Sequence, residues 1–205
     1  SGSTPLGGRS GLNVSGILLR SRTIMITYSN ESTRAGVGRW MHNPVTGELG
    51  HLLLPPSDTG GQRMAAELWL QPGAAVLGTH THSAIIETFE VLEGLLGYTL
   101  DGAEAVAAPG ESAVIPAGAA HDWWNAGDAP ARIRFTIAST NPDRPMAARF
   151  LSLIEFAWGM AAAGRTNAKG MPGPLWLAAM AQEYADVMRL TTPPVAVQRA
   201  IFGPL

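Results

Sequence analysis

Two stretches of this sequence, HTHSAIIETFEVLEG at residues 80–94 and GESAVIPAGAAHDWWN at residues 110–125, alternate short apolar runs with glycine and proline turns. Similar runs recur around them at intervals of about 8–12 residues, which predicts an all-β sandwich or barrel. Asp101-Gly102 between two runs predicts a two-residue hairpin turn. The predicted strands cover residues 22–28, 50–54, 64–70, 87–92, 95–100, 103–107, 112–115, 121–124 and 132–138.

The same two stretches carry histidines at spacings that suit one shared site. His80 and His82 are two residues apart, so on a strand their side chains point to the same face. Glu87 follows after a short break, from which the next strand segment can bring it to the same place. His121 opens a later strand, which must lie beside the first. The spacing therefore predicts a cluster of three imidazoles and one carboxylate.

Such a cluster suits a divalent transition metal. Imidazole and carboxylate ligands accept iron, manganese, cobalt, nickel, copper or zinc. Four protein ligands leave two positions of an octahedral ion for a substrate or O₂. A divalent ion beside one carboxylate has a net charge of about +1, which favours an anionic, bidentate oxygen ligand such as an enolate, a catecholate or a carboxylate.

These residues resemble the two motifs of the cupin superfamily over about residues 63–138. The second motif matches without deviation at Gly110, Pro116, Gly118, His121 and Asn125. The first matches from His80 through Gly94. One departure concerns the leading glycine: six residues separate Gly73 from His80 where the family has five, and this indicates a slightly longer loop.

The resemblance implies an all-β fold: an antiparallel jelly-roll (cupin) barrel with an N-terminal strand extension and a C-terminal helical tail. It also implies that His80, His82, Glu87 and His121 bind one divalent metal inside the barrel. Iron is the favoured metal, and zinc, nickel, manganese, cobalt and copper stay open. Single-barrel cupins often dimerise through strand exchange, so a homodimer is expected.

The chain is expected to divide into a flexible tail at residues 1–21, a cupin barrel at 22–140 and a helical extension at 141–205. Whether residues 1–24 are native stays open. In the extension we expect helices over 146–163 and 175–190 and a short third helix over 195–202. This strongly apolar tail must be buried. Packing on the outer face of the barrel or exchange with a second subunit is favoured over capping the barrel mouth.

Strand parity also selects candidates for a substrate pocket and for catalysis beyond the metal ligands. Trp123 shares parity with His121, and Phe89 and Val91 share it with Glu87. With Trp69 they form the predicted pocket lining, although ordinary core packing is an equal alternative. Weaker catalytic candidates are Glu67, Tyr98 and Arg134. For the two charged residues, a solvated face with ion pairs is the simpler interpretation.

Composition excludes several classes of protein. The chain of 205 residues has no cysteine, so disulfides, thiolate zinc sites and thiol nucleophiles are absent. A net charge of −2 gives no basic field for nucleic acid. The longest apolar-biased run, residues 150–163, is too short to span a membrane, and no signal peptide is evident. We expect a cytoplasmic protein with a small-molecule substrate and no nucleic-acid or membrane partner.

Together these features predict a metal-dependent cupin enzyme that acts on a small oxygen-rich substrate, an enol, diketone, catechol or carboxylate. Dioxygenase-like oxidation is the favoured class of reaction. A non-redox isomerase, a polyketide-type cyclase or a lyase is the alternative within enzymes. A cupin that binds a small ligand without reacting is the alternative outside them, since the fold alone does not choose a chemistry.

Overall fold

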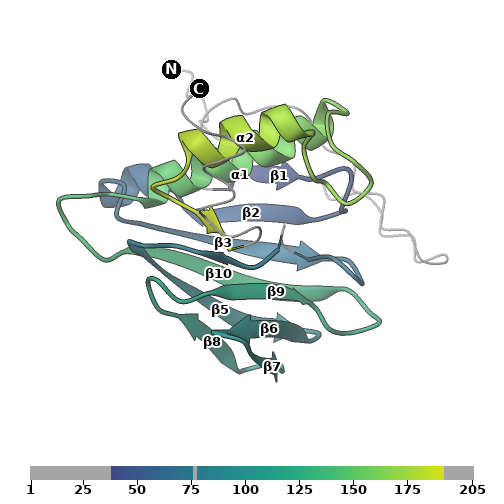
Figure 1. The fold of residues 1–205 in the computed structure, drawn as a ribbon. Coiled ribbons are helices and arrows are strands. Elements are labelled where there is room, and N and C mark those ends of the chain that lie inside the picture. The colour runs from purple at the N-terminus through teal and green to yellow at the C-terminus, as the bar shows by residue number, and fades with distance from the viewer. Residues whose placement is uncertain (1–37, 76–77, 192–205) are drawn as a thin grey trace, which may run out of the picture. The chain divides into compact units, whose positions relative to one another are not determined.

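Two antiparallel sheets form a jelly roll in this computed structural model, which describes residues 38–75 and 78–191, all from one unit of the chain (Figure 1). The first sheet has the order β1 (Trp40–His42), β2 (Leu49–Leu54), β3 (Arg63–Leu70), β10 (Ala131–Ser139), β5 (Ile85–Glu93) and β8 (Ser112–Ile115). The second has the order β11 (Arg189–Leu190), β4 (His80–Thr81), β9 (His121–Asn125), β6 (Leu96–Leu100) and β7 (Ala103–Ala107).

Side-chain alternation explains why these segments form strands. In β10, Ile133, Phe135 and Ile137 are buried, whereas Arg132 and Arg134 alternate with them and lie on the outer face. The strand thus presents an apolar face to the core and a charged face to solvent. β3 and β5 flank β10 in register and alternate in the same way.

Glycine at position 94 is required by a close approach of two chain segments. Gly94 has a φ of 78°, a conformation that other residues rarely adopt. A Cβ atom there would lie 2.7 Å from the Cα atom of Ala131. This contact holds the end of β5 against the start of β10.

The prediction of a jelly roll is confirmed, and each predicted strand within the described residues is present. Three short strands were not predicted: β1, β4 and β11. They are two or three residues long, so they carry no periodicity of their own. The predicted strand at 22–28 and the predicted helix at 195–202 lie outside the described residues.

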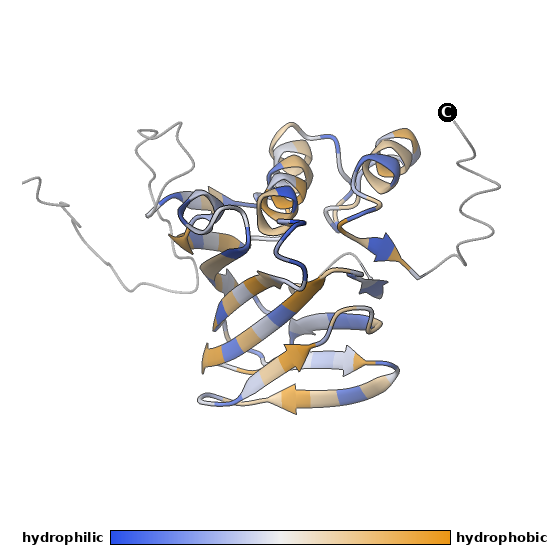
Figure 2. Ribbon diagram, turned by 90° about the vertical axis from the view of Figure 1, so that its left-hand side faces the viewer, coloured by the Kyte–Doolittle hydropathy of each residue, from blue (hydrophilic) through white to orange (hydrophobic). Residues whose placement is uncertain are grey.

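Helices follow the barrel in sequence and lie over one side of it (Figures 1 and 2). α1 (Ala147–Ala162) agrees with the prediction within a residue at each end, and a short 3₁₀ helix, η1 (Pro56–Thr59), precedes β3. α2 (Pro174–Glu183) is shorter than predicted and ends at Glu183. The chain then turns back and pairs as β11 with β4. No helix of the described residues is long and apolar enough to cross a bilayer.

The shortened second helix corrects the sequence-based prediction and has a tertiary cause. A continuous helix to residue 190 would satisfy its own backbone hydrogen bonds. Instead Val187, which is 1% exposed, packs into the core, and its carbonyl oxygen accepts a hydrogen bond from His82. Contact with the barrel therefore replaces the last two turns of the predicted helix.

Candidate metal centre

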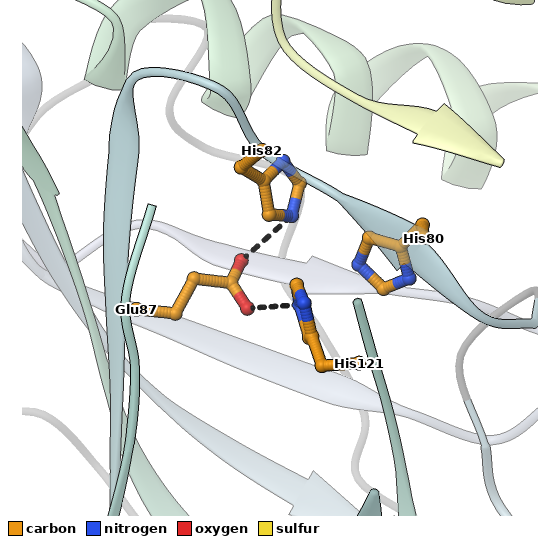
Figure 3. A group of neighbouring side chains, drawn as sticks. All are labelled: His80, His82, Glu87 and His121. Carbon is orange, nitrogen blue, oxygen red and sulfur yellow. Dashed lines mark hydrogen bonds and ion pairs between the residues drawn. The ribbon is translucent and has the colours of Figure 1, made fainter. Parts of the chain in front are cut away.

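The four residues singled out by their spacing meet inside the barrel (Figure 3). One ligand atom from each of His80, His82, Glu87 and His121 lies within 4.8 Å of every other. All four side chains are buried, with at most 3% of their surface exposed. The prediction of a cluster that can hold a metal ion is confirmed.

Strand pairing brings these residues together. His80 on β4 pairs directly with His121 on β9 in the second sheet. His82 follows β4 directly, and Glu87 comes from β5 in the first sheet. The break between β4 and β5 lets the chain pass from one sheet to the other, so the carboxylate faces the imidazoles across the interior.

Backbone carbonyls orient the three imidazole rings. The Nδ1 atom of His80 lies 2.9 Å from the backbone oxygen of Gly78. The Nδ1 atom of His121 lies 3.1 Å from the backbone oxygen of Ala119. The Nδ1 atom of His82 lies 2.7 Å from the backbone oxygen of Val187. A carbonyl only accepts, so each Nδ1 must carry the proton and donate it. Each Nε2 then keeps its lone pair. Metal-binding histidines ordinarily have this arrangement of the outer nitrogen.

The chemistry of the donor atoms fits a divalent cation. Nε2 of His121 lies 2.9 Å and Nε2 of His82 lies 3.2 Å from the two oxygens of Glu87. Between two lone-pair acceptors such distances require a proton or a metal ion. Nε2 of His82 is buried and makes no hydrogen bond, which is uncommon for a buried polar atom. Three nitrogens and one carboxylate are ligands that iron, zinc, nickel, manganese and copper accept.

Burial, mutual charge and hydrogen bonds shift the pKa values of three of the four ligands. Burial, reinforced by the charges of His82 and His121, lowers the pKa of His80 to about 3, so its ring is neutral. Burial alone would raise the pKa of Glu87, but the hydrogen bond with His121 and the close contact with His82 outweigh it and lower that pKa to about 2. Burial opposes protonation of His121, yet its hydrogen bond to Glu87 raises its pKa. A metal ion would replace this shared proton.

A cavity adjoins the cluster and reaches the helices. Its volume is about 120 Å³. His80, His82 and Glu87 lie on its wall, together with apolar residues of β3 and of α1. Helix residues on the wall are Phe150, Leu151, Leu153, Ile154, Ala157, Trp158 and Met180. The helical tail therefore forms part of the pocket wall, a role that sequence reasoning placed behind outer-face packing and exchange with a second subunit.

The structure divides the predicted pocket residues into three groups. Trp123 lies on the cavity wall. Phe89 and Val91 are fully buried but lie behind that wall, where Phe89 packs on Phe135 at 5.1 Å between ring centroids. Trp69 points to the opposite face of the first sheet, where Arg132 lies over its ring at 5.6 Å. Because Leu68 and Leu70 take the inward positions on β3, parity turns Trp69 outward.

The three catalytic candidates do not reach the cavity. Glu67 pairs with Arg132 at 3.1 Å and with Arg134 at 3.3 Å on the outer face. Arg134 also pairs with Glu90 at 2.9 Å. Tyr98 packs against the core from β6 without lining the cavity. The outward ion-pair interpretation thus holds for the charged residues, and their catalytic role is not supported.

Asn125 and Gly118 of the second motif have structural roles in turns. The amide of Asn125 donates to the oxygens of Leu70 and Ala129, and its own oxygen accepts from the backbone of Gly127. The N–H of Gly118 donates to the oxygen of His82 at 2.7 Å. The second motif therefore also holds a ligand of the first in place.

Sequence reasoning did not select a polar group at the other end of the cavity. Asn43, Thr46 and Glu48, in the loop between β1 and β2, line the same wall. The parity of β2 offered a signal, because Glu48 alternates with Gly50 and Leu52, which pair with inward residues of β3. The contact of Val187 with His82 had no local signal, since 105 residues separate the two.

Comparison with known proteins agrees with this geometry. The family model described as a cupin domain matches residues 67–137. A protein from Thermus thermophilus is 30% identical over 38% of this chain and 74% of its own, with a TM-score of 0.36. A sugar phosphate isomerase of the cupin superfamily from Silicibacter pomeroyi is 30% identical over 52% of this chain and 67% of its own, with a TM-score of 0.40. No curated protein matches the sequence.

The fold and the site define a jelly-roll protein with a buried cluster of three histidines and one glutamate that can hold a metal ion. Because the family model of the cupin domain matches residues 67–137 of this jelly roll, the chain belongs to the cupin superfamily.

Proposed function

We propose that this cupin is a metal-dependent enzyme that acts on a small, mainly apolar molecule with oxygen donors, by dioxygenase-like oxidation. One observation carries the proposal. The convergent ligands open into a buried apolar cavity, and Glu48 is the single ionisable side chain among the described wall residues besides the ligands themselves.

The residues of the chain have separate tasks in this proposal. His80, His82, Glu87 and His121 would hold the metal, with iron as the favoured ion. Bound there, a divalent iron would supply the redox chemistry with O₂, whereas zinc, nickel or manganese would supply mainly Lewis acidity. The negative charge of Glu87 leaves the site with a net charge of about +1, which attracts an anionic oxygen donor such as an enolate or a catecholate.

The cavity wall supports an oxidation better than a proton-transfer reaction. Isomerisation, cyclisation and decarboxylation require an acid or a base positioned at the reacting carbon. No described wall residue close in the fold to the four ligands supplies one. A dioxygenase places both atoms of O₂ in its substrate, so the reaction balances without a reductant. Apolar side chains such as Phe150 and Leu151 would exclude water from this step.

The test uses protein purified without added metal and without a metal-chelating column. We expect about one equivalent of iron by elemental analysis, and O₂ consumption with members of a panel of catechols, diketones and flavonol-like compounds. His80→Ala removes a ligand and is expected to lose both, while Glu90→Gln on the outer face keeps both.

Three results would overturn parts of the proposal. Turnover that continues without O₂ would replace the oxidation by an isomerase, cyclase or lyase reaction. Turnover retained in metal-free His80→Ala protein would remove the metal from the mechanism. A protein that takes up no metal even on reconstitution would be a small-ligand-binding cupin.

A further inference from the structure

The loop between β1 and β2 places a carboxylate inside the cavity. Glu48 directly precedes β2, is 7% exposed and lines the same cavity as the metal ligands. Asn43 and Thr46 of the same loop lie beside it on the wall. In a wall that is otherwise mainly apolar, this is a local concentration of polar atoms.

The loop is built so that the carboxylate is held in one position. The backbone N–H of Asn43 donates to the oxygen of Glu48, and that of Gly47 donates to the oxygen of Asn43, both at 2.9 Å. The side-chain oxygen of Asn43 accepts from the backbone of Thr46 at 3.3 Å. The hydroxyl of Thr46 then donates to Oε2 of Glu48 at 2.8 Å, and the Asn43 amide lies 3.4 Å from the same oxygen.

The charge of Glu48 is not compensated. Within the described residues no cation pairs with it, and its second oxygen, Oε1, accepts no hydrogen bond. Burial raises the pKa of this carboxyl group against the effect of its two hydrogen bonds. An ionised carboxylate buried without a counter-charge lowers stability. The contacts within the loop engage only Oε2, so Oε1 is left to accept a hydrogen bond from a ligand.

Glu48 and the ligand Glu87 lie toward opposite ends of the first sheet. Glu87 on β5 pairs with Ile137 on β10, and Ile137 in turn pairs with Met64 at the start of β3. Leu49 pairs with Trp69, which places Glu48 beside the end of β3. The six residue steps from Met64 to Leu70 span about 20 Å of strand. Ala66, Leu68 and helix residues of α1 form the wall between.

We propose that Asn43, Thr46 and Glu48 form a distal subsite that binds a hydrogen-bond donor, a hydroxyl or an amine, on the end of the substrate away from the metal. The inference rests on the proposed function, since it assumes that the other end of the substrate binds at the metal through oxygen donors. The substrate class is then an elongated, mainly apolar molecule with chelating oxygens at one end and a donor group at the other.

The test uses zinc-loaded protein, which is redox-inert, and measures binding by calorimetry. The probes are 4-alkylcatechols with chains of four to ten carbons, each compared with the same compound tipped by a hydroxyl or an amine. The catechol oxygens chelate the metal, and the chain length sets how far the tip reaches. At the length that spans the cavity, we expect a tipped probe to bind about tenfold or more tightly than its untipped partner, because the acceptor is charged.

Glu48→Gln is expected to abolish this preference while the affinity for untipped alkylcatechols stays unchanged. Thr46→Val, which removes the hydroxyl that holds the carboxylate, is expected to weaken the preference in part and covers the case in which Glu48→Gln does not fold. The matched control is Glu67→Gln, a carboxylate of the neighbouring strand that faces outward, and it should behave as the wild type.

The outcomes separate the subsite from the proposed function. Alkylcatechols that bind with no preference for a tip at any length would overturn the subsite alone, as would a preference that survives in Glu48→Gln. Failure of every catechol to bind the wild-type metal centre would overturn the proposed function, and the subsite with it. A melting temperature of Glu48→Gln several degrees below that of the wild type at pH 7 would show that the carboxylate is structural and would also overturn the subsite.

Discussion

Arg149 joins the helical tail to the metal site, and Arg149→Met tests that link. The Arg149 guanidinium on α1 donates to the carboxylate of Glu183 at 3.0 Å and to the backbone oxygen of the same residue at 2.5 Å. It also donates to the carboxylate of Asp186 at 3.0 Å. It also lies over the ring of Tyr184 at 5.1 Å. These contacts hold the turn that follows α2, and that turn supplies the carbonyl of Val187 to His82.

The expected magnitude follows from the exposure of these partners. The side chains of Arg149, Glu183 and Asp186 are 38%, 65% and 34% exposed, so solvent screens both ion pairs to about 0.2–1 kcal/mol each. A cation–π contact at an exposed position adds about 0.5–1 kcal/mol. The total is about 2 kcal/mol, which would raise the population of the open turn roughly 30-fold. Where opening of the turn is coupled to global unfolding, the melting temperature would fall by roughly 4–8 °C.

Two measurements check the prediction. Hydrogen exchange of residues 184–191 should accelerate in Arg149→Met. Zinc affinity in a competition with a chelator should fall by about tenfold, the low end of the effect of losing an outer partner of a metal ligand. Arg144→Met is the control, because Arg144 approaches Asp186 only to 3.9 Å and makes no hydrogen bond to it. Unchanged exchange and zinc affinity in Arg149→Met would refute the link between the tail and the metal site.

Three further predictions concern the ligands, the cavity carboxylate and the tail. Glu87→Gln should lower zinc affinity by more than about 100-fold, because a direct ligand matters more than an outer partner, while Glu90→Gln on the other face of β5 leaves it unchanged in the same competition assay. Because the pKa of Glu48 is raised in the folded protein, its contribution to stability is fully present below the ordinary value of 4.5 and is lost as the pH rises through the raised value. The melting temperature of Glu48→Gln should therefore rise relative to that of the wild type between pH 4 and pH 8. Both proteins contain the other ionisable groups of the described wall, which are His80, His82 and Glu87. A melting-temperature difference between the two proteins that does not change with pH would contradict the raised pKa of Glu48. Phe150→Ala should cost about 3–5 kcal/mol in urea unfolding, since the ring is 5% exposed and packs on Phe135 and His82, whereas Leu175→Ala, at 83% exposure, should cost almost nothing.

Local periodicity was enough to predict most of the barrel and the metal ligands. A strand exposes its own alternation, so residues such as Ile133, Phe135 and Ile137 indicate β10 without knowledge of their partners. His80 and His82 share a face for the same reason. The match of two motifs then indicated that His121 would lie beside His80, as the strand pairing has it.

Parity alone does not say which face of a strand turns inward when both faces carry large side chains. Trp69 was expected in the pocket, but Leu68 and Leu70 occupy the inward positions of β3, and Trp69 packs with Arg132 outside. Glu67 and Arg134 lie outside for the same reason. The choice depends on what covers each face, which is set by elements distant in sequence.

The amino-acid order by itself determined the longer strands of the barrel, the four ligands and the family, because each depends on spacings of a few residues. The tertiary structure decided that α2 ends at Glu183, that Val187 orients His82, and that α1 closes a cavity with Glu48 in its wall. These features depend on contacts between segments dozens of residues apart. Their free energy comes from burying apolar surface between those segments, and no local pattern records it.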